Sequence, residues 1–434
     1  RKGESMENKI KRSWQPKKTP IQKEILAGIT GFFAISYIII VNPIILTDAG
    51  IPANLSVFAT IFSSFIGSLI MGIWADAPII ITPGMGVNAF FTYTLVVGMD
   101  LTWEQAIAIS IISSFLYMVI AFTPISEYLA QKIPQNLKIG ITAGIGMFLV
   151  VLGLEKAGIV KSGGSRSLLA MGNLLAPEVI LSLLGIMLTL ILFLRRVPGD
   201  FIIGIIVISI LGNIIGVKGS NVPNIRLTEI SKYSEIVAQG DFSQLFTLKF
   251  LIAIFSMTMI LVFESMGILE GLLPIKSQFK KAFQASSIAA FLSGFLGTSP
   301  TVAAAESASG IQSGGRRGAM AITSGLLFLA AIFLIPLLSF IPEAAIAPVI
   351  IITGATMMQQ LRFVKFADFS EWFPTFLILV LIPLTSSIST GLAFGFIVYP
   401  ICKLVVGNYR DVSKVMYALS LLFLIQLVCE SIIG

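Results

Sequence analysis

The 434-residue sequence contains no histidine, only two cysteines and few charged residues. The absence of histidine removes the usual protein ligand of transition metals and the usual proton carrier near neutral pH, so any proton chemistry has to rest on carboxylates. Cys402 and Cys429 both lie in apolar stretches and support neither a disulfide framework nor a thiolate metal cluster. We expect no metal site, no cofactor and no enzyme, because no nucleophile–base pair can be nominated.

Only 12% of the residues are charged and 56% are hydrophobic, which leaves too little polar surface for several water-soluble domains. Apolar runs of about 17 to 25 residues recur from Ile25 to Ile433, long enough to cross a hydrocarbon layer of roughly 30 Å as helices. We predict an all-α polytopic membrane protein with 14 transmembrane segments. The predicted segments are 25–47, 55–75, 79–98, 103–123, 136–153, 176–196, 200–217, 249–270, 282–297, 300–312, 318–340, 344–361, 372–387 and 390–406.

The distribution of Lys and Arg predicts the orientation. Placing the N-terminus in the cytoplasm assigns 22 of the 29 basic residues to the cytoplasmic side, as the positive-inside rule requires. Seven segments per half make the two halves inverted repeats. The predicted organisation is a cytoplasmic basic arm at 1–24, a first repeat at 25–217, an extracytoplasmic loop at 218–248, a second repeat at 249–407 and an apolar or interfacial helix at 408–434. Orientation explains the net charge of +7 better than a nucleic-acid partner does.

Two of the predicted segments are poor helix formers, at Ala77–Tyr93 and Thr298–Gly315. Each has a proline near its start, and these prolines lie 222 positions apart in the chain. Gly84 and Glu306 are separated by the same offset. Interrupted segments at corresponding positions of two halves are the best sequence indication of a transporter's substrate site.

Within these segments, Ile79–Thr82 and Thr301–Ala303 are β-prone or small. Because backbone polar groups inside a membrane have to be paired, we predict two short antiparallel strands, in segments 3 and 10, that pair with each other. Each strand leads into a half-helix, whose N–H groups near Gly86–Asn88 and Ser307–Ser309 face one cavity and favour a polar or partly anionic ligand. The alternative is two merely kinked helices.

Two carboxylates lie inside predicted segments, Glu264 and Glu306, and an ionisable residue at that depth is functional by default. Glu306 shares a helix face with Gly310, which is small enough for a flat ligand or another helix to approach closely. Glu264 has Gly267 and Gly271 on its own face, which indicates a cavity. The alternative for both acids is a hydrogen-bonded tie between helices. Only the second break carries an acid of its own.

Asn88 offers both donors and an acceptor to a ligand, although it could equally cap the first half-helix. Phe263, next to Glu264, is a candidate stacking partner for a flat ligand. Asn42 precedes Pro43 and is expected to satisfy backbone groups freed where the proline breaks the first segment. The candidate substrate-binding residues are Glu264, Glu306, Asn88, Phe263, Gly86, Val87, Ser307 and Ala308, and the candidate proton-coupling residues are Glu306 and Glu264.

Four motifs resemble the nucleobase cation symporter-2 superfamily (nucleobase/ascorbate transporters), and within it the AzgA-type adenine/guanine/hypoxanthine permeases. They are ISYIIIVNPIILTDAGIP at 35–52, TPGMGVNAFFTY at 82–93, FESMGILEGL at 263–272 and GTSPTVAAAESASGIQSGGRRG at 297–318. The resemblance covers nearly the whole chain. It implies a seven-plus-seven, uracil-permease-like fold with core and gate domains and with the substrate between the two broken segments.

The resemblance also implies roles for single residues. Glu264 matches the acidic residue of the eighth segment, Glu306 that of the tenth and Asn88 the amide of the third. Two positions depart from the purine-permease pattern. Glu264-Ser265 stands where aspartate and threonine are usual and is closer to the xanthine/uracil relatives, and Arg317 stands where threonine is usual.

These observations predict a secondary active transporter of the plasma membrane that imports a purine base (adenine, guanine or hypoxanthine) with a proton. Sodium in place of the proton, and a homodimer, stay open at this point. The alternatives are a uracil/xanthine-type symporter and an inorganic anion carrier of the same fold, against which the mid-depth acids argue because they repel anions. The expected partners are the purine base and the lipid bilayer.

Overall fold

The computed structural model describes residues 20–163, 169–197, 199–217 and 227–433. Most of the predicted N-terminal arm and the first part of the predicted inter-repeat loop, residues 218–226, lie outside the described residues. The first half contains α2 (Ile21–Ile35), α3 (Ile38–Asp48), α4 (Ala53–Trp74), β1 (Ile81–Pro83), α5 (Met85–Ala89), the π-helix η1 (Phe90–Gly98), α6 (Trp103–Phe122), α7 (Ile125–Lys132), α8 (Gln135–Lys156), β2 (Val160–Ser162), β3 (Leu169–Met171), α9 (Pro177–Leu194) and α10 (Asp200–Ile214).

The second half continues with the same kinds of element. It contains η2 (Leu227–Glu235), α11 (Leu248–Leu272), η3 (Lys276–Gln278), α12 (Phe279–Phe295), β4 (Thr301–Ala303), α13 (Ser307–Gln312), α14 (Gly318–Ala330), η4 (Ala331–Phe340), α15 (Glu343–Met358), η5 (Gln359–Phe363), α16 (Phe369–Thr385), α17 (Ile388–Val405), η6 (Tyr409–Asp411) and α18 (Lys414–Ile433).

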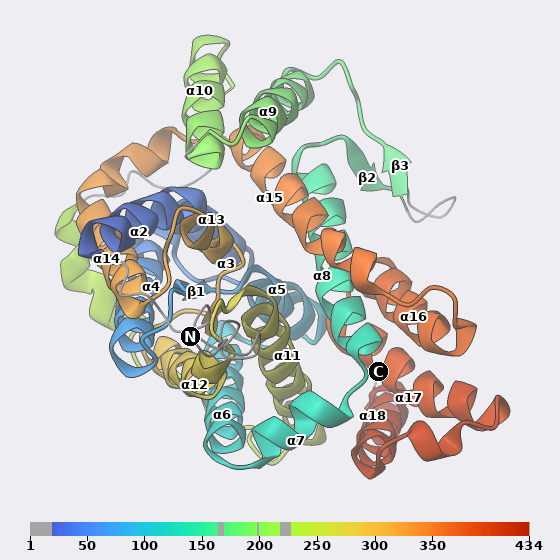
Figure 1. The fold of residues 1–434 in the computed structure, drawn as a ribbon. Coiled ribbons are helices and arrows are strands. Elements are labelled where there is room, and N and C mark those ends of the chain that lie inside the picture. The colour runs from blue at the N-terminus through green and yellow to red at the C-terminus, as the bar shows by residue number, and fades with distance from the viewer. Residues whose placement is uncertain (1–19, 164–168, 198, 218–226, 434) are drawn as a thin grey trace, which may run out of the picture.

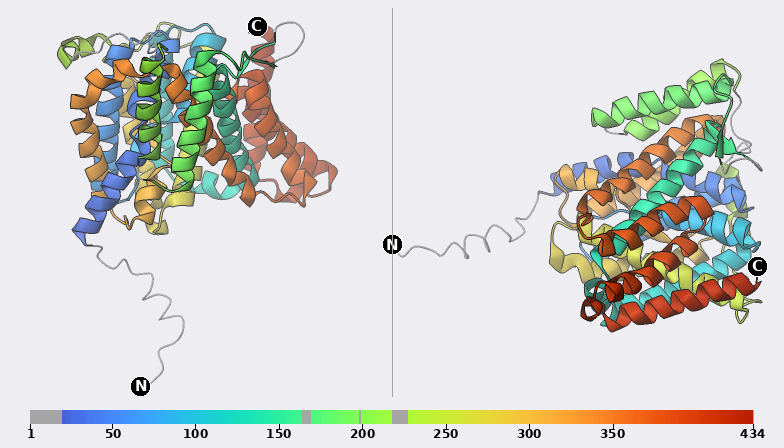
Figure 2. Two further views of the ribbon diagram at one scale, coloured as in Figure 1. Left: turned by 90° about the horizontal axis from the view of Figure 1, so that it is seen from above. Right: turned by 90° about the vertical axis from the view of Figure 1, so that its right-hand side faces the viewer.

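The predicted helical membrane protein is confirmed. By length and composition, nine helices in the described part of the chain can cross a membrane. Helices α10 and α16 are apolar but shorter, as is the apolar part of α18. The long helices run side by side through one bundle (Figure 2). The count of 14 segments stays a prediction. The last apolar stretch forms α18, whose Phe423 ring lies 5.0 Å from those of Phe255 and Phe396.

The first predicted segment breaks at a different place from the one we expected. Helix α3 runs through Pro43, and the interruption falls at Ser36 and Tyr37, between α2 and α3. The Asn42 side chain therefore does not satisfy freed backbone groups. Its amide nitrogen instead donates to the hydroxyl oxygens of Thr60, at 2.8 Å, and Thr298, at 3.1 Å. Asn42 thus ties α3 to α4 and to the second broken segment.

The helices pack into two groups (Figure 1). In the first, which we call the core group, α2–α6 pack with α11–α14. In the second, the gate group, α8–α10 pack with α15–α17. Helices α9 and α10 lie at one edge of the molecule and α18 lies at the opposite edge (Figures 1 and 2). Each group draws on both halves of the sequence, as the core and gate domains of the predicted fold require.

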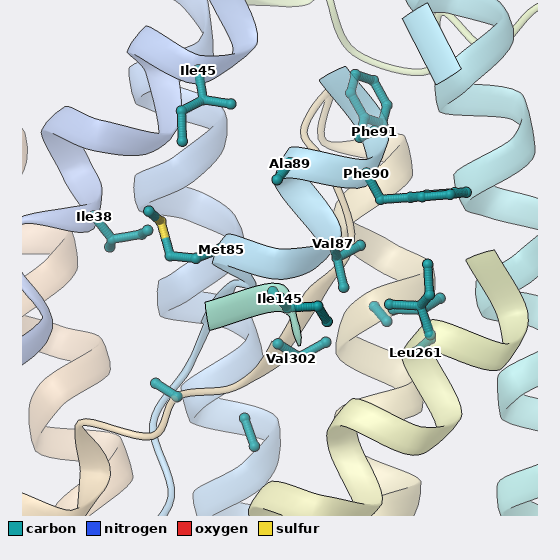
Figure 3. Close-up of a cluster of buried hydrophobic side chains, with 14 of the residues drawn as sticks. Ile38, Ile45, Met85, Val87, Ala89, Phe90, Phe91, Ile145, Leu261 and Val302 are labelled. Atoms are coloured by element: carbon teal, nitrogen blue, oxygen red, sulfur yellow. The ribbon is translucent and has the colours of Figure 1, made fainter. Parts of the chain in front are cut away.

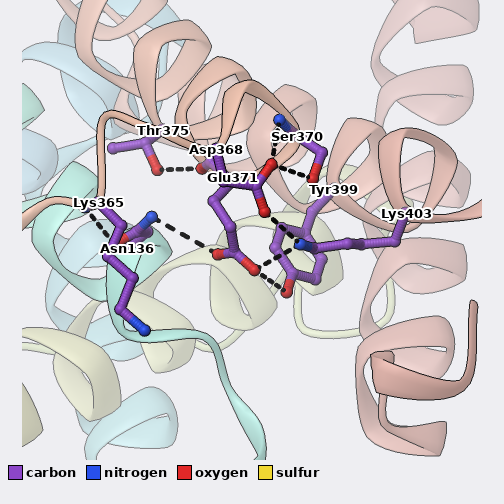
Figure 4. A network of polar contacts seen from close by, with 8 residues as sticks. All are labelled: Asn136, Lys365, Asp368, Ser370, Glu371, Thr375, Tyr399 and Lys403. Atoms are coloured by element: carbon purple, nitrogen blue, oxygen red, sulfur yellow. Dashed lines mark hydrogen bonds and ion pairs between the residues drawn. The ribbon is translucent and has the colours of Figure 1, made fainter. Parts of the chain in front are cut away.

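A polar network around the buried Lys403 holds one end of the gate group together (Figure 4). The Lys403 ammonium of α17 lies 2.7 Å from Glu371 Oε1 of α16 and 3.2 Å from Asp368 Oδ2. Glu371 also accepts from the Tyr399 hydroxyl at 3.0 Å and from the Asn136 amide of α8 at 3.5 Å. A hydrogen bond from the Ser370 hydroxyl lowers the pKa of the Asp368 carboxyl. Ion pairs thus join α17 to α16, and an amide hydrogen bond adds α8.

Two ion pairs join helix α8 to the core group, one near each of its ends. Near its start, Lys138 lies 3.4 Å from Glu270 of α11. At its last residue, Lys156 lies 2.9 Å from Asp48 of α3, which also accepts from the Tyr93 hydroxyl at 2.7 Å. The boundary between the two groups is therefore bridged by charge at both ends of one helix.

Glycines allow the closest helix crossings in both groups. In the gate group, a Cβ built on Gly354 of α15 would clash with the Gly146 carbonyl oxygen of α8. In the core group, a Cβ built on Gly318 of α14 would clash with the Gly72 carbonyl oxygen of α4. Small residues at such crossings let two backbones approach where lipid supplies no hydrophobic driving force.

We predict that Gly354→Ala lowers the melting temperature of the detergent-solubilised protein, because the methyl group forces α8 and α15 apart at a cost of about 1–3 kcal/mol. Gly271→Ala is the matched control, since a Cβ at this position of α11 meets no atom within 4 Å. Alanine has the higher helix propensity, so the control variant should be as stable as the unmodified protein or slightly more stable. Equal melting temperatures for the two variants would contradict this account of the crossing.

Candidate functional site

The two broken segments meet in a short antiparallel pair of strands, as predicted. Ile81 of β1 pairs with Ala303 of β4, and Pro83 pairs with Thr301. Backbone hydrogen bonds continue beyond both ends of the pair, from Ala304 N–H to the Ile80 carbonyl at 2.9 Å and from Gly84 N–H to that of Pro300 at 3.4 Å. The alternative of two kinked helices is therefore wrong. A second pair of strands, β2 and β3, lies in the connection between α8 and α9 and was not predicted.

Serine hydroxyls complete the hydrogen bonding of the two strands. Ser68 of α4 accepts from Ile81 N–H at 3.0 Å and donates to the Ile81 carbonyl at 3.2 Å. Ser293 of α12 accepts from Thr301 N–H at 3.2 Å, and Ser307 accepts from Ile80 N–H at 2.9 Å. Sequence reasoning missed Ser68 and Ser293, because a serine in an apolar helix gives no sign of which backbone group it will meet.

Each strand leads into a half-helix, and the two half-helices begin at equivalent positions. The residue before α5 is Gly84 and the residue before α13 is Glu306, separated by the 222-residue offset. Helix α5 continues into the π-helix η1, whereas α13 ends after six residues. Figure 3 shows the start of α5 surrounded by apolar side chains, with Val87 beside Val302 and Ile145. The first N–H groups of each half-helix have no partner within the helix.

Glu264 of α11 presents its carboxylate to the start of α5. Its side chain is buried, and Oε2 has no hydrogen-bond partner in the described part of the chain. A Cβ built on Gly86 would lie 3.2 Å from Oε2, and one built on Gly84 would lie 3.6 Å from Oε1. Only the second break carries an acid of its own, as expected, because position 84 is glycine. Glu264 of α11 nevertheless supplies a carboxylate beside the first break, where it lies next to Gly86.

Glu306 stands at the start of α13 and is only partly buried. Its Oε1 accepts a hydrogen bond of 2.5 Å from the Tyr37 hydroxyl, which lies in the break between α2 and α3. The neighbouring Ala305 is exposed and Ala308 is partly exposed, so this side of the break is open to solvent. Sequence reasoning missed Tyr37, since the position of the first break was itself misplaced.

Gly310, on the predicted face of Glu306, packs against protein. A Cβ there would lie 2.6 Å from the Ala27 carbonyl oxygen of α2 and even closer to the Met320 side chain of α14. The sequence allowed either a flat ligand or another helix on this face, and the structure places helices there. The Gly310 side of α13 is therefore covered by α2 and α14.

Asn88 lies on α5 with its whole amide buried. Neither its oxygen nor its nitrogen has a hydrogen-bond partner among the described residues, and one turn later the Thr92 hydroxyl also lacks one. No side chain caps α5, so the capping alternative for Asn88 is wrong. An unsatisfied buried amide is costly and rare, which keeps Asn88 as a candidate ligand-binding group.

The remaining predicted residues divide by their surroundings. Gly86 and Val87 are buried at the start of α5, where their backbone N–H groups lie in the first turn. The Ser307 hydroxyl oxygen accepts from Ile80 N–H, and the backbone N–H groups of Ser307 and Ala308 donate to the carbonyls of Ala304 and Ala305, each at 3.1 Å. The Phe263 ring stacks on Phe396 of α17, with centroids 5.4 Å apart and an angle of 16° between the planes. One of its faces therefore already has a protein partner.

The fold defines the class of protein. The chain resembles the transmembrane domain of the cyanobacterial bicarbonate transporter BicA, with a TM-score of 0.63 at 16% identity over 86% of this chain and 97% of that one. It also resembles murine Slc26a9, an anion transporter in its inward-facing state, with a TM-score of 0.62 at 14% identity over 92% and 73% of the two chains. At such low identity the likeness shows the fold alone, which is that of inverted-repeat membrane transporters.

Sequence comparison gives the family. Residues 22–394 match the model of a permease family, Xan_ur_permease. The nucleobase transporter PlAzg2 of Paenibacillus larvae is 41% identical over 87% of this chain and 76% of its own length. The guanine/hypoxanthine permease PbuO of Bacillus subtilis is 37% identical over 94% and 98%, and the adenine permease AdeP of Escherichia coli is 33% identical over 94% and 93%. The chain belongs to this nucleobase/ascorbate transporter family, as its motifs predicted.

We predict that Ser307→Ala destabilises the paired breaks, because it leaves the buried Ile80 N–H without its acceptor, at a cost of about 1–3 kcal/mol. Ser313→Ala, at the exposed end of α13, removes a hydroxyl that bonds only within its own helix turn and serves as the control. Thermal unfolding of both variants in detergent checks the difference. An unchanged melting temperature for Ser307→Ala would show that the strand pair does not depend on this hydroxyl.

Proposed function

We propose that this chain is a secondary active transporter that imports purine nucleobases such as adenine, guanine and hypoxanthine. Relatives named as guanine/hypoxanthine and adenine permeases match it over more than nine-tenths of its length. The observation that carries the proposal is the arrangement of polar groups at the breaks. Two half-helices each begin beside a carboxylate, and the buried Glu264 Oε2 and Asn88 amide have no partner among the described residues.

These groups complement the edge of a planar base. Its N–H groups would donate to Glu264 Oε2 and the Asn88 oxygen, while the Asn88 NH₂ and the backbone N–H groups of Gly86 and Val87 would donate to ring nitrogens and exocyclic oxygen. The backbone N–H groups of Ser307 and Ala308 are left out, because they already donate to the carbonyls of Ala304 and Ala305. Pairing every polar group of the site would remove the penalty of leaving them unsatisfied. Phe263 is left out of this site, because its ring already stacks on Phe396.

We further propose that a proton accompanies the base. A carboxylate is an acceptor only, whereas its protonated form also donates, so protonation of Glu306 or Glu264 would change which edge of a base is bound. With no histidine in the chain, these two acids are the groups at the site that can carry the proton. Sodium coupling is the other outcome that the test below can reveal.

Alternating access would come from movement of the gate group against the core group, with the breaks between them. The two ion pairs of α8 lie at opposite ends of this boundary, so rocking would lengthen one while keeping the other. We propose that the protein lies in the plasma membrane with its N-terminus in the cytoplasm, an orientation that the excess of Lys and Arg on one side supports.

A second candidate is a uracil/xanthine-type symporter. The observation that favours it is Glu264-Ser265, which departs from the aspartate–threonine pattern of purine permeases. The anion carriers of the same fold share only 14–16% identity with this chain and do not bear on its substrate. Competition of labelled adenine and guanine uptake by unlabelled xanthine, uracil and sulfate separates these candidates.

We predict that Glu264→Gln and Glu306→Gln each reduce purine uptake into proteoliposomes by about tenfold or more, because a hydrogen bond to a charged acceptor contributes about 1.5–3 kcal/mol. Glu178→Gln, an exposed acid in the first turn of α9, is the control and should transport normally. If the double variant with both glutamines transports purine at the unmodified rate, the site assignment is wrong.

Proton coupling predicts that an inwardly directed pH gradient, imposed at zero membrane potential, drives accumulation of purine above its external concentration. The protonophore-treated vesicle is the control and should only equilibrate. Accumulation that follows a sodium gradient and ignores the pH gradient would replace the proton by Na⁺ and leave the substrate assignment unchanged.

A further inference from the structure

Tyr37 contacts both helix groups at the point where they meet Glu306. The residue lies in the break between α2 and α3, and its side chain is fully buried. Its hydroxyl lies 2.5 Å from Glu306 Oε1 and 3.4 Å from the Thr353 hydroxyl of α15. Its ring meets that of Phe201 of α10 edge to face, with centroids 5.2 Å apart. Glu306 belongs to the core group, whereas Thr353 and Phe201 belong to the gate group.

The hydrogen bonding around the phenol has a defined direction. A tyrosine hydroxyl carries one proton, which it donates to Glu306 Oε1, and its oxygen then accepts from Thr353. Such a chain strengthens each of its members by polarisation. Because Oε1 already accepts from Tyr37, Oε2 is the Glu306 oxygen that keeps both of its acceptor sites for a ligand.

Tyr37 lies in the short turn between α2, which ends at Ile35, and α3, which begins at Ile38. Ser36 and Tyr37 both keep right-handed helical backbone angles there, so the two helices continue in nearly the same course.

We propose that Tyr37 is a positioning residue for substrate recognition. It fixes the Glu306 carboxylate so that Oε2 meets the purine base, and its contacts with Thr353 and Phe201 make that orientation depend on the position of the gate group. This inference rests on the proposed function. It adds a residue that does not itself touch the base and a link between binding and gate position.

The test compares Tyr37→Phe with Tyr117→Phe in the same proteoliposomes. Tyr117 is an equally buried tyrosine whose hydroxyl donates to the Phe283 carbonyl at 3.3 Å, within the packing of α6 and α12. Removing the Tyr37 hydroxyl should raise the KM for purine by about fivefold or more without lowering the melting temperature further than the control does. Thr353→Val should shift the KM in the same direction by less. An unchanged KM for Tyr37→Phe would overturn the proposal.

A double variant separates positioning from general damage. If Tyr37 acts through Glu306, Tyr37→Phe combined with Glu306→Gln should be no worse than Glu306→Gln alone. Independent effects that multiply would contradict the proposal, because they would mean that Tyr37 acts on something else.

A spectroscopic measurement distinguishes failure of this inference from failure of the proposed function. The infrared carboxylate band of Glu306, identified by its loss in Glu306→Gln, should shift in Tyr37→Phe and not in Tyr117→Phe, with no substrate present. A shifted band in a protein that takes up no purine would reject the proposed function while keeping the contact. Purine uptake with an unshifted band would reject the positioning role alone.

Discussion

The structure depends on one constraint, which is that backbone polar groups inside an apolar bundle must find partners. Two segments leave the helical conformation midway, and each exposes N–H and C=O groups that lipid cannot satisfy. Their pairing as β1 and β4, completed by three serine hydroxyls, meets that demand. Every other feature of the site follows from it, because the strand pair fixes where both half-helices begin.

The pseudo-symmetry of the two halves provides equivalent positions that carry different chemistry. Gly84 and Glu306 both precede a half-helix, yet each half-helix has a carboxylate beside it. At α13 the acid is the preceding residue itself, whereas at α5 it comes from α11, through Glu264. A side chain at Gly84 would first meet Val302 of β4, whereas a Cβ at Gly86 would lie 3.2 Å from Glu264 Oε2. A carboxylate beside each helix start also stabilises the positive end of the helix dipole.

Sequence reasoning predicted the architecture of the site better than its contacts. The strand pair was predictable, because proline, β-prone residues and a shared offset all point to the same interruption. Strand β4 has the predicted bounds, whereas β1 spans Ile81–Pro83 and so begins and ends later than the predicted Ile79–Thr82. The break at Ser36 and Tyr37 was not, since no proline marks it and Pro43, which does mark a break by local rules, is accommodated within α3. Tertiary packing decided between the two positions.

Side-chain partners were the least predictable part. The position of Ser307 suggested a ligand contact, but its hydroxyl accepts a hydrogen bond from Ile80 N–H. The position of Phe263 suggested stacking on a ligand, but its ring stacks on Phe396. Both outcomes depend on segments more than 100 residues away in the sequence. Tyr37 escaped notice for the same reason, because its partner Glu306 lies 269 residues further along the chain. A single sequence shows which polar groups and aromatic rings need a partner, but it does not show which residue will contact them in the fold.

The pairing of Ile81 with Ala303 has a consequence for biosynthesis. The two residues are 222 positions apart, so at synthesis rates of about 5–20 residues per second the first strand waits on the order of ten to forty-five seconds for its partner. During that interval Ser68 of the preceding helix has already been synthesised and can accept the hydrogen bond of Ile81 N–H. The ribosome therefore synthesises most of the chain before β1 of the first half can pair with β4. Neither half is a complete folding unit.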